Sequence, residues 1–308
     1  MRKNRGLAIA QASITGFGML RATTALFLLS AAANASDREM IPGFDAARAA
    51  FSRTGEMDLG SGKGDLDMAR FEVRSVLCRP LSPADGLFIL PFADYEFSVL
   101  DFDGAPTPFQ DEELHSISLS SVFLSMSEGS PWLWGGWARA QLASDFQHVD
   151  GDDFTFDLAG GAAYRFNERF TLGLGVGVIN LNGDAAVYPG IGFDWIVSDQ
   201  LRVGLYGPSF IAEWAMDEDW LLTFRGDPGG GVWNVTGAAG ESRSIDLTSY
   251  RLGLYASRRI TGQLWLTAGG GMTVGNEIDY TTSGGREILG LDPETGFFGA
   301  IGLRLKAW

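Results

Sequence analysis

The segment from Phe154 to Val178 alternates between apolar or aromatic residues and small or polar ones. Alternation with a period of two is typical of a β-strand with two different faces, not of a helix. It is interrupted at Asn167 and Glu168, so the segment predicts two long strands joined by a short turn. A strand of about 13 residues, at roughly 3.3 Å per residue, can cross the roughly 25 Å apolar band of an outer membrane at barrel tilt. The pattern therefore predicts one hairpin of a transmembrane β-barrel.

The rest of the chain repeats this pattern between connections of two kinds. Short polar turns are expected at residues 198–200, 217–219 and 261–263, whereas residues 234–243 and 277–295 are expected to be long extracellular loops. The fold class predicted is all-β: an antiparallel up-and-down transmembrane barrel of about 14 strands in one domain, residues 36–308. The number falls to about 12 if residues 46–58 form no strand or if Gly207 and Pro208 form only a bend. Pro91 predicts a bulge, because proline cannot donate to the strand ladder.

The first 35 residues have the features of a signal peptide. Basic residues, including Arg2 and Arg21, precede an apolar core, and an Ala-Asn-Ala cleavage site ends at Ala35. The core is too short to span a bilayer as a helix. Both Met1 and Met19 are compatible with the translation start.

Composition narrows the classes of partner. The formal net charge of −15 argues against nucleic-acid binding, which needs a basic face. Cys78 is the single cysteine, so internal disulfides and cysteine-based metal clusters are excluded. The expected surroundings are outer-membrane lipid and lipopolysaccharide, while the oligomeric state stays open.

The last strand is expected to end at the aromatic Trp308. A terminal aromatic residue after alternating apolar positions is similar to the signal by which the barrel-assembly machinery recognises its clients. Ile301, Leu303 and Leu305 share one parity and Trp308 has the other, so the match requires a bulge near Ala307.

The segment from Pro189 to Trp220 resembles the central signature of a family of bacterial outer-membrane β-barrel proteins, a domain-of-unknown-function family. The residues that carry the resemblance are Pro189, Gly190, Gly192, Phe193, Trp195, Gly207, Pro208 and Trp220. The resemblance implies a barrel fold and an outer-membrane location, and it implies no substrate and no catalytic residue.

If the apolar parity faces lipid, the opposite parity lines the lumen. Acidic and basic residues are nearly balanced on that parity, which fits either a narrow polar pore or a filled barrel braced by ion pairs. The candidate lumen-lining residues are Glu72, Arg74, Asp94, Glu96, Arg139, Asp157, Arg165, Asp194, Glu213, Arg225, Arg251 and Arg304.

Catalytic and metal sites are not predicted. His115 and Ser116 are neighbours on a strand and point to opposite faces, so they cannot form a nucleophile and base pair. The acidic run from Asp150 to Asp153 is a weak calcium motif, and a solvated loop surface is the simpler interpretation. No cofactor is expected.

Three functions remain open. The leading hypothesis is an outer-membrane β-barrel that acts as a passive channel or small-molecule transporter. The alternative is a closed structural or adhesion barrel that acts through acidic extracellular loops. A soluble secreted β-protein is the third class, and cell fractionation would separate it from the other two.

Overall fold

The structure is a computed structural model that describes residues 45–306, apart from positions 61, 85, 107, 128, 182–183, 238–239 and 283–284. The predicted signal peptide, residues 1–35, lies outside the described residues, as do Ala307 and Trp308. No described helix is both long enough and apolar enough to cross a membrane.

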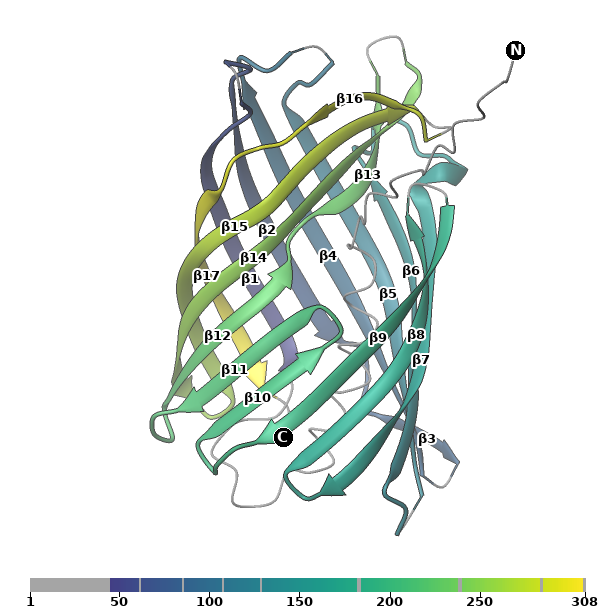
Figure 1. Cartoon of the computed structure of the whole chain (residues 1–308), viewed down its shortest axis with the longest axis vertical. Helices are drawn as coiled ribbons and strands as arrows, with labels where there is room; N and C mark the ends of the chain where they lie inside the picture. Colours follow the sequence, from purple (N-terminus) through teal and green to yellow (C-terminus); the bar gives the residue numbers. More distant parts are fainter. Residues whose placement is uncertain are drawn as a thin grey trace, which may run out of the picture.

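The described residues form a closed antiparallel barrel of 14 strands (Figure 1). Neighbours in sequence pair around the wall, and β1 closes the ring against β17, with Phe51 opposite Ile301. Two of the 14 wall strands consist of two consecutive segments each: β12 and β13 form one, and β16 and β17 form the other. The short β3 lies between β2 and β4 and pairs with β4. The elements are β1 (Asp45–Asp58), β2 (Asp65–Val76), β3 (Leu81–Ala84), β4 (Leu87–Asp103), β5 (Glu112–Met126), β6 (Trp132–Ser144), the 3-10 helix η1 (Gly151–Asp153), β7 (Phe154–Asn167), β8 (Phe170–Leu181), β9 (Asp184–Ile196), β10 (Leu201–Tyr206), β11 (Ser209–Ala215), β12 (Trp220–Pro228), β13 (Gly231–Thr236), β14 (Ser242–Thr261), β15 (Leu264–Thr282), β16 (Glu287–Leu291) and β17 (Gly296–Lys306).

Short polar residues close the turns at one end of the barrel, which we call the turn end. The Asn167 side chain accepts a hydrogen bond from the backbone N–H of Arg169 at 2.8 Å. The Asp217 carboxylate accepts the N–H groups of Asp219 and Trp220, both at 2.8 Å. Such side-chain turns satisfy backbone donors where the ladder stops. We call the opposite end, with the longer connections, the loop end.

The alternation confirms the outward parity. Phe156 and Leu174 are 67% and 66% exposed on the outer face, and Asp157 on the opposite parity is 3% exposed. Residues 46–58 belong to β1, and residues 206–209 make a two-residue hairpin in which Gly207 has a φ of 63°. A positive φ at the first loop position suits a hairpin turn that glycine adopts without strain. The count of 14 strands is therefore confirmed over 12.

Two local predictions are wrong. The register of β4 against β5 runs unbroken through Pro91, without a bulge. The Pro91 carbonyl accepts a hydrogen bond from the Leu77 N–H just beyond the end of β2, so the missing proline donor faces a place where the ladder has already ended. The expected extracellular loops contain much strand, because residues 234–236 belong to β13, residues 242–243 to β14, residues 277–282 to β15 and residues 287–291 to β16.

The β10–β11 hairpin is much shorter than its neighbours. Figure 1 shows it ending part-way up the wall between β9 and β12. The pairing of β9 with β10 covers Gly192 to Ile196, and the pairing of β11 with β12 ends at Phe210 opposite Gly226. Beyond Gly226 the chain stays paired with β14, first through Asp227 and Pro228 and then as β13, but it has lost β11 as its other neighbour, and Asn234 of β13 meets β6 instead.

Candidate functional site in the barrel lumen

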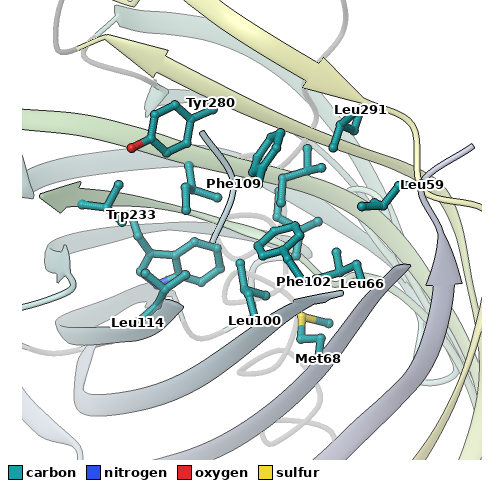
Figure 2. Close-up of a cluster of buried hydrophobic side chains, with 14 of the residues drawn as sticks. Leu59, Leu66, Met68, Leu100, Phe102, Phe109, Leu114, Trp233, Tyr280 and Leu291 are labelled. Atoms are coloured by element: carbon teal, nitrogen blue, oxygen red, sulfur yellow. The ribbon is translucent and has the colours of Figure 1, made fainter. Parts of the chain in front are cut away.

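The lumen at the loop end is filled by apolar side chains, which Figure 2 shows gathered between the strands. Trp233 of β13 is 2% exposed, and Phe109 reaches the same cluster from the loop between β4 and β5. The expectation of a polar inner face is wrong here, because the inward positions of several strands turn apolar toward this end. We call the cluster the apolar plug; its members are Met57, Leu59, Leu66, Met68, Leu100, Phe102, Phe109, Leu114, Ala143, Trp233, Val235, Ile245, Leu247, Ile278, Tyr280 and Leu291.

β13, which is paired with β14, is also bonded on its other side to the loop end of β6. Asn234 is in register with Ser144 at the end of β6, in a parallel bridge. The Asp145 N–H donates to the Asn234 carbonyl at 3.0 Å, and the Asp145 carboxylate accepts the Thr236 N–H at 2.7 Å. Because these bonds join residues far apart in sequence, they fix β13 in place only in the folded barrel. We call this contact the β13 latch.

Acidic side chains surround the latch. Glu112 is the first residue of β5 and is 5% exposed. It lies nearer the loop end than Ile117 and Leu119, the exposed apolar residues of that strand. The pKa of Glu112 is raised to about 7, chiefly by burial and to a smaller extent by the nearby Asp145 and Asp111 carboxylates, against a hydrogen bond from Gln110 that lowers it. Burial likewise raises the pKa of Asp153, whose side chain meets Asn234 and Ser144. Asp153 therefore adds a side-chain contact to Asn234 of β13 beside the latch.

Below the plug, toward the turn end, the lumen holds a cavity of ≈ 380 Å³. Basic side chains outnumber acidic ones in its lining by nine to five among the described residues. This contrasts with the net charge of −15 for the whole chain. The basic lining residues are Arg48, Arg70, Arg74, Arg139, Arg202, Arg225, Arg251, Arg304 and Lys306, and the acidic ones are Asp45, Glu72, Asp94, Glu213 and Asp227.

Most of these charges are paired across neighbouring strands. Arg202 donates to both oxygens of Asp194, at 2.8 and 2.7 Å, and the two side chains are buried. Arg139 pairs with the buried Asp157, donating from Nε to Oδ2 at 2.7 Å. Removing one partner of such a pair would leave an uncompensated buried charge. Further pairs join Arg48 to Glu72, Arg70 to Glu96, Arg74 to Asp94, Arg225 to Asp227, and both Arg304 and Lys306 to Asp45.

Arg251 differs from its neighbours. It lies opposite Asp227 in the register of β12 and β14, but the Asp227 carboxylate pairs with Arg225. The Arg251 guanidinium lies over the Phe298 ring at 4.1 Å, and its Nε has no hydrogen-bond partner among the described residues. A Cβ at Gly229 would meet the Arg251 stem at 2.4 Å, so this glycine leaves the room in which the stem lies.

The opposite side of the cavity is apolar. Leu90 and Phe92 of β4, Val122 of β5 and Trp137 of β6 line it. The apolar and cationic sides meet where Arg139 lies over the Trp137 ring at 5.4 Å. The cavity is therefore amphipathic, with an apolar wall facing a cationic one.

The structure distributes the sequence-predicted lumen residues among three places. Eight of them line the cavity: Glu72, Arg74, Asp94, Arg139, Glu213, Arg225, Arg251 and Arg304. Glu96, Asp157 and Asp194 lie behind the lining as partners of Arg70, Arg139 and Arg202. Arg165 is outside the cavity, on β7 near its turn to β8.

Sequence reasoning missed Asp45, Arg48, Arg70, Arg202, Asp227 and Lys306 as lining residues. Parity alone could have found Arg70, which shares the parity of Glu72, and Arg202, which shares that of the inward Gly204. Asp45 and Lys306 stand at strand ends, where alternation is too short to assign a face. Among the described residues, no group of three or more His, Cys, Asp or Glu side chains is placed to hold a metal ion.

Residues 93–306 match the model of a protein family described as a domain of unknown function, DUF6268. The chain belongs to the DUF6268 family. The match covers most of the barrel wall, including β4 to β17, and it contains the segment from Pro189 to Trp220 whose residues resemble an outer-membrane family signature. No curated protein matches this DUF6268 chain in sequence.

Solved structures share the barrel architecture at low identity. An outer membrane channel from Pseudomonas putida F1 covers 88% of this DUF6268 chain and 98% of its own, at 12% identity and a TM-score of 0.45. A Pseudomonas aeruginosa FadL homologue covers 84% and 90%, at 9% identity and a TM-score of 0.41. A KdgM porin covers 85% and 99%, at 5% identity and a TM-score of 0.33.

Proposed function

We propose that this protein is an outer-membrane channel or transporter for small solutes, closed in the conformation described here. The observation that carries the proposal is a charged cavity inside a barrel whose outer face is apolar. A barrel that served only as a brace would need no such cavity. Outer-membrane barrels have long extracellular loops and short periplasmic turns, so in the proposed orientation the loop end is extracellular and the turn end is periplasmic.

The outer surface supports insertion into a bilayer. Tryptophans stand beside the short turns, where Trp132, Trp195, Trp214 and Trp220 are all 36% exposed or more. Aromatic side chains of this kind favour the boundary between lipid and water. Apolar side chains such as Leu174 are exposed between this rim and the loop end. Monomeric soluble proteins rarely expose so large an apolar surface.

The apolar plug favours a gated channel rather than a permanently open pore. The plug and β13 fill the extracellular half of the lumen, whereas the cavity lies in the periplasmic half. β13 is paired with β14 from Gly231 to Thr236 and is joined to the end of β6 only by the latch at Asp145, where a few hydrogen bonds contribute about 0.5–1.5 kcal/mol each, so the latch is the contact that breaks if β13 moves with β14 away from β6. Movement of β13 is therefore the simplest route by which the lumen opens.

Planar-bilayer recordings test the proposal. Purified wild-type protein is expected to conduct rarely, and Asp145→Ala is expected to conduct more often because it removes the carboxylate that holds Thr236. Asp199→Ala is the matched control, since Asp199 is exposed at the turn end. If folded wild-type and Asp145→Ala barrels gave neither conductance nor solute flux, the proposal would fail.

The second candidate is a closed adhesion or structural barrel. It is favoured by the same plug, together with carboxylates at the loop end such as the half-buried Asp150 and the exposed Asp152. The double variant Asp150→Asn and Asp152→Asn should then reduce binding to cells or matrix and leave conductance unchanged. Deleting residues 277–290 would not make a clean test, because this segment contains strand from both β15 and β16.

A further inference from the structure

The cationic side of the cavity is short of one negative charge. Five carboxylates share the lining with nine basic side chains, and Glu96, Asp157 and Asp194 pair with the lining from behind. One positive charge remains after these are matched. Because a buried cation is costly without a counter-charge, this residual charge favours an anion in the cavity.

Arg251 is the group to which that charge belongs. Among the described residues, no carboxylate lies within 4.0 Å of its guanidinium, although Asp227 is its partner in register. Its position is nevertheless well defined, since the stem lies over Gly229 and the head over Phe298. An arginine held in place with donors left over can bind a carboxylate through two parallel hydrogen bonds.

The apolar wall limits the kind of anion. Phe92 and Trp137 line the cavity together with Leu90 and Val122, so a fully hydrated inorganic ion would leave this surface in contact with water. An organic anion with an apolar body would bury the surface and still present its charge to Arg251. The cavity of ≈ 380 Å³ has room for a body of one or two rings or an equivalent chain.

We propose that the lumen cavity is a binding site for a small organic anion, with Arg251 holding the anionic head and the Leu90, Phe92, Val122 and Trp137 wall holding the apolar body. The inference deepens the proposed channel function, because it names the substrate class. The site itself depends only on the folded barrel.

Calorimetric titration of the purified full-length barrel in detergent with benzoate and benzamide tests this site. The two probes have nearly the same shape and differ in charge, and neither forms micelles. Benzoate is expected to bind saturably, with one site per chain and at least tenfold more tightly than benzamide. Acetate, which has the head without the body, is expected to bind at least tenfold more weakly than benzoate.

Two variants probe Arg251 in different ways. Arg251→Gln should remove the preference for benzoate over benzamide, because it removes the charge and keeps most of the side chain. Gly229→Ala should weaken benzoate binding several-fold while keeping the charge, since the new Cβ displaces the Arg251 stem. Arg259→Gln is the control, because Arg259 pairs with Asp219 at the turn end, away from the cavity. Urea unfolding of each variant reports whether the barrel is intact.

Each outcome separates this inference from the channel proposal. Equal binding of benzoate and benzamide, or an unchanged preference in Arg251→Gln, would overturn the anion site even if the barrel conducts. Equal binding of acetate and benzoate would overturn the role of the apolar wall. Charge-selective benzoate binding by a barrel that never conducts would support the site and refute the channel.

Discussion

Trp233→Ala is the sharpest test of the apolar plug. Trp233 is 2% exposed, and its indole packs within the cluster that closes the loop end of the lumen (Figure 2). Truncating a buried tryptophan to alanine removes apolar contacts and leaves a hole that the surrounding strands fill only in part. We therefore expect a loss of stability together with a weaker seal.

The magnitude follows from the burial of the indole and from its polar atom. Burial of this degree predicts a loss of about 3–5 kcal/mol for truncation to alanine. The Trp233 Nε1 has no acceptor among the described residues, and removing an unsatisfied buried donor relieves a penalty of about 1–3 kcal/mol. Taking the middle of each range, a loss of about 4 kcal/mol offset by a relief of about 2 kcal/mol leaves an expected net loss of about 2 kcal/mol.

Two measurements follow this change in parallel. Urea unfolding in detergent gives the free energy of unfolding, and planar-bilayer recording gives the open probability, which should rise because the plug has lost its largest side chain. Trp134→Ala is the matched control, since Trp134 is 59% exposed on the outer face and far from the plug in the wall. It should leave the open probability unchanged.

One result would refute the reasoning about the plug. If Trp233→Ala lost less than about 1 kcal/mol and conducted like wild type, the cluster would be neither a tightly packed core nor a seal. A loss of stability without a change in conductance would instead leave the plug as a structural core and move the gate elsewhere.

Other predictions address the wall, the ion pairs and the loop end. Leu174→Arg should cost about 2–4 kcal/mol in lipid vesicles, measured by urea unfolding, because it places a charge on the outer apolar face; tolerance would mean that this face does not meet lipid. Asp194→Asn should cost about 3–5 kcal/mol because Arg202 would stay buried without its counter-charge, whereas Asp199→Asn at the exposed rim should change stability little. For Glu112, burial raises the folded-state pKa from 4.5 to about 7, so its carboxyl should destabilise the barrel progressively as the pH rises from about 4.5 to above 7. Glu112→Gln should be more stable than wild type at pH 8 and show a flatter stability profile, and an unchanged profile would mean that Glu112 is not the group that titrates. The loss of charge-selective benzoate binding in Arg251→Gln completes the set.

In the candidate site, the alternation of residues predicts which side chains face inward but not which of them form ion pairs. Alternation assigned Arg251 and Arg225 to the inner face, and both line the cavity. It could not show that Asp227 pairs with Arg225 on the same strand and leaves Arg251 without a carboxylate. Rotamers decide that choice, and they depend on neighbours such as Phe298 from a strand distant in sequence.

The fold at the loop end depends on contacts that no local pattern contains. Residues 234–243 are polar and rich in glycine, which locally is typical of a loop. In the structure Asn234 and Thr236 belong to β13, which is paired with β14 and reaches β6 on its other side, because the short β10–β11 hairpin leaves that side without a neighbour and because Asp145 accepts its backbone. A hydrogen bond between residues 91 positions apart has no signature in sequence.

The sequence by itself determined the barrel and its outward face and narrowed the strand number to about 14 or 12, because a period of two fixes the direction of each side chain and short polar turns mark where strands end. The Phe154 to Val178 hairpin shows the alternation and the short polar turn locally. Only the tertiary structure decided that the lumen is closed at one end and amphipathic at the other. Parity gives the direction of a side chain but not what it meets, and what Trp233 and Arg251 meet is set by closure of the ring, which brings together strands from both ends of the chain.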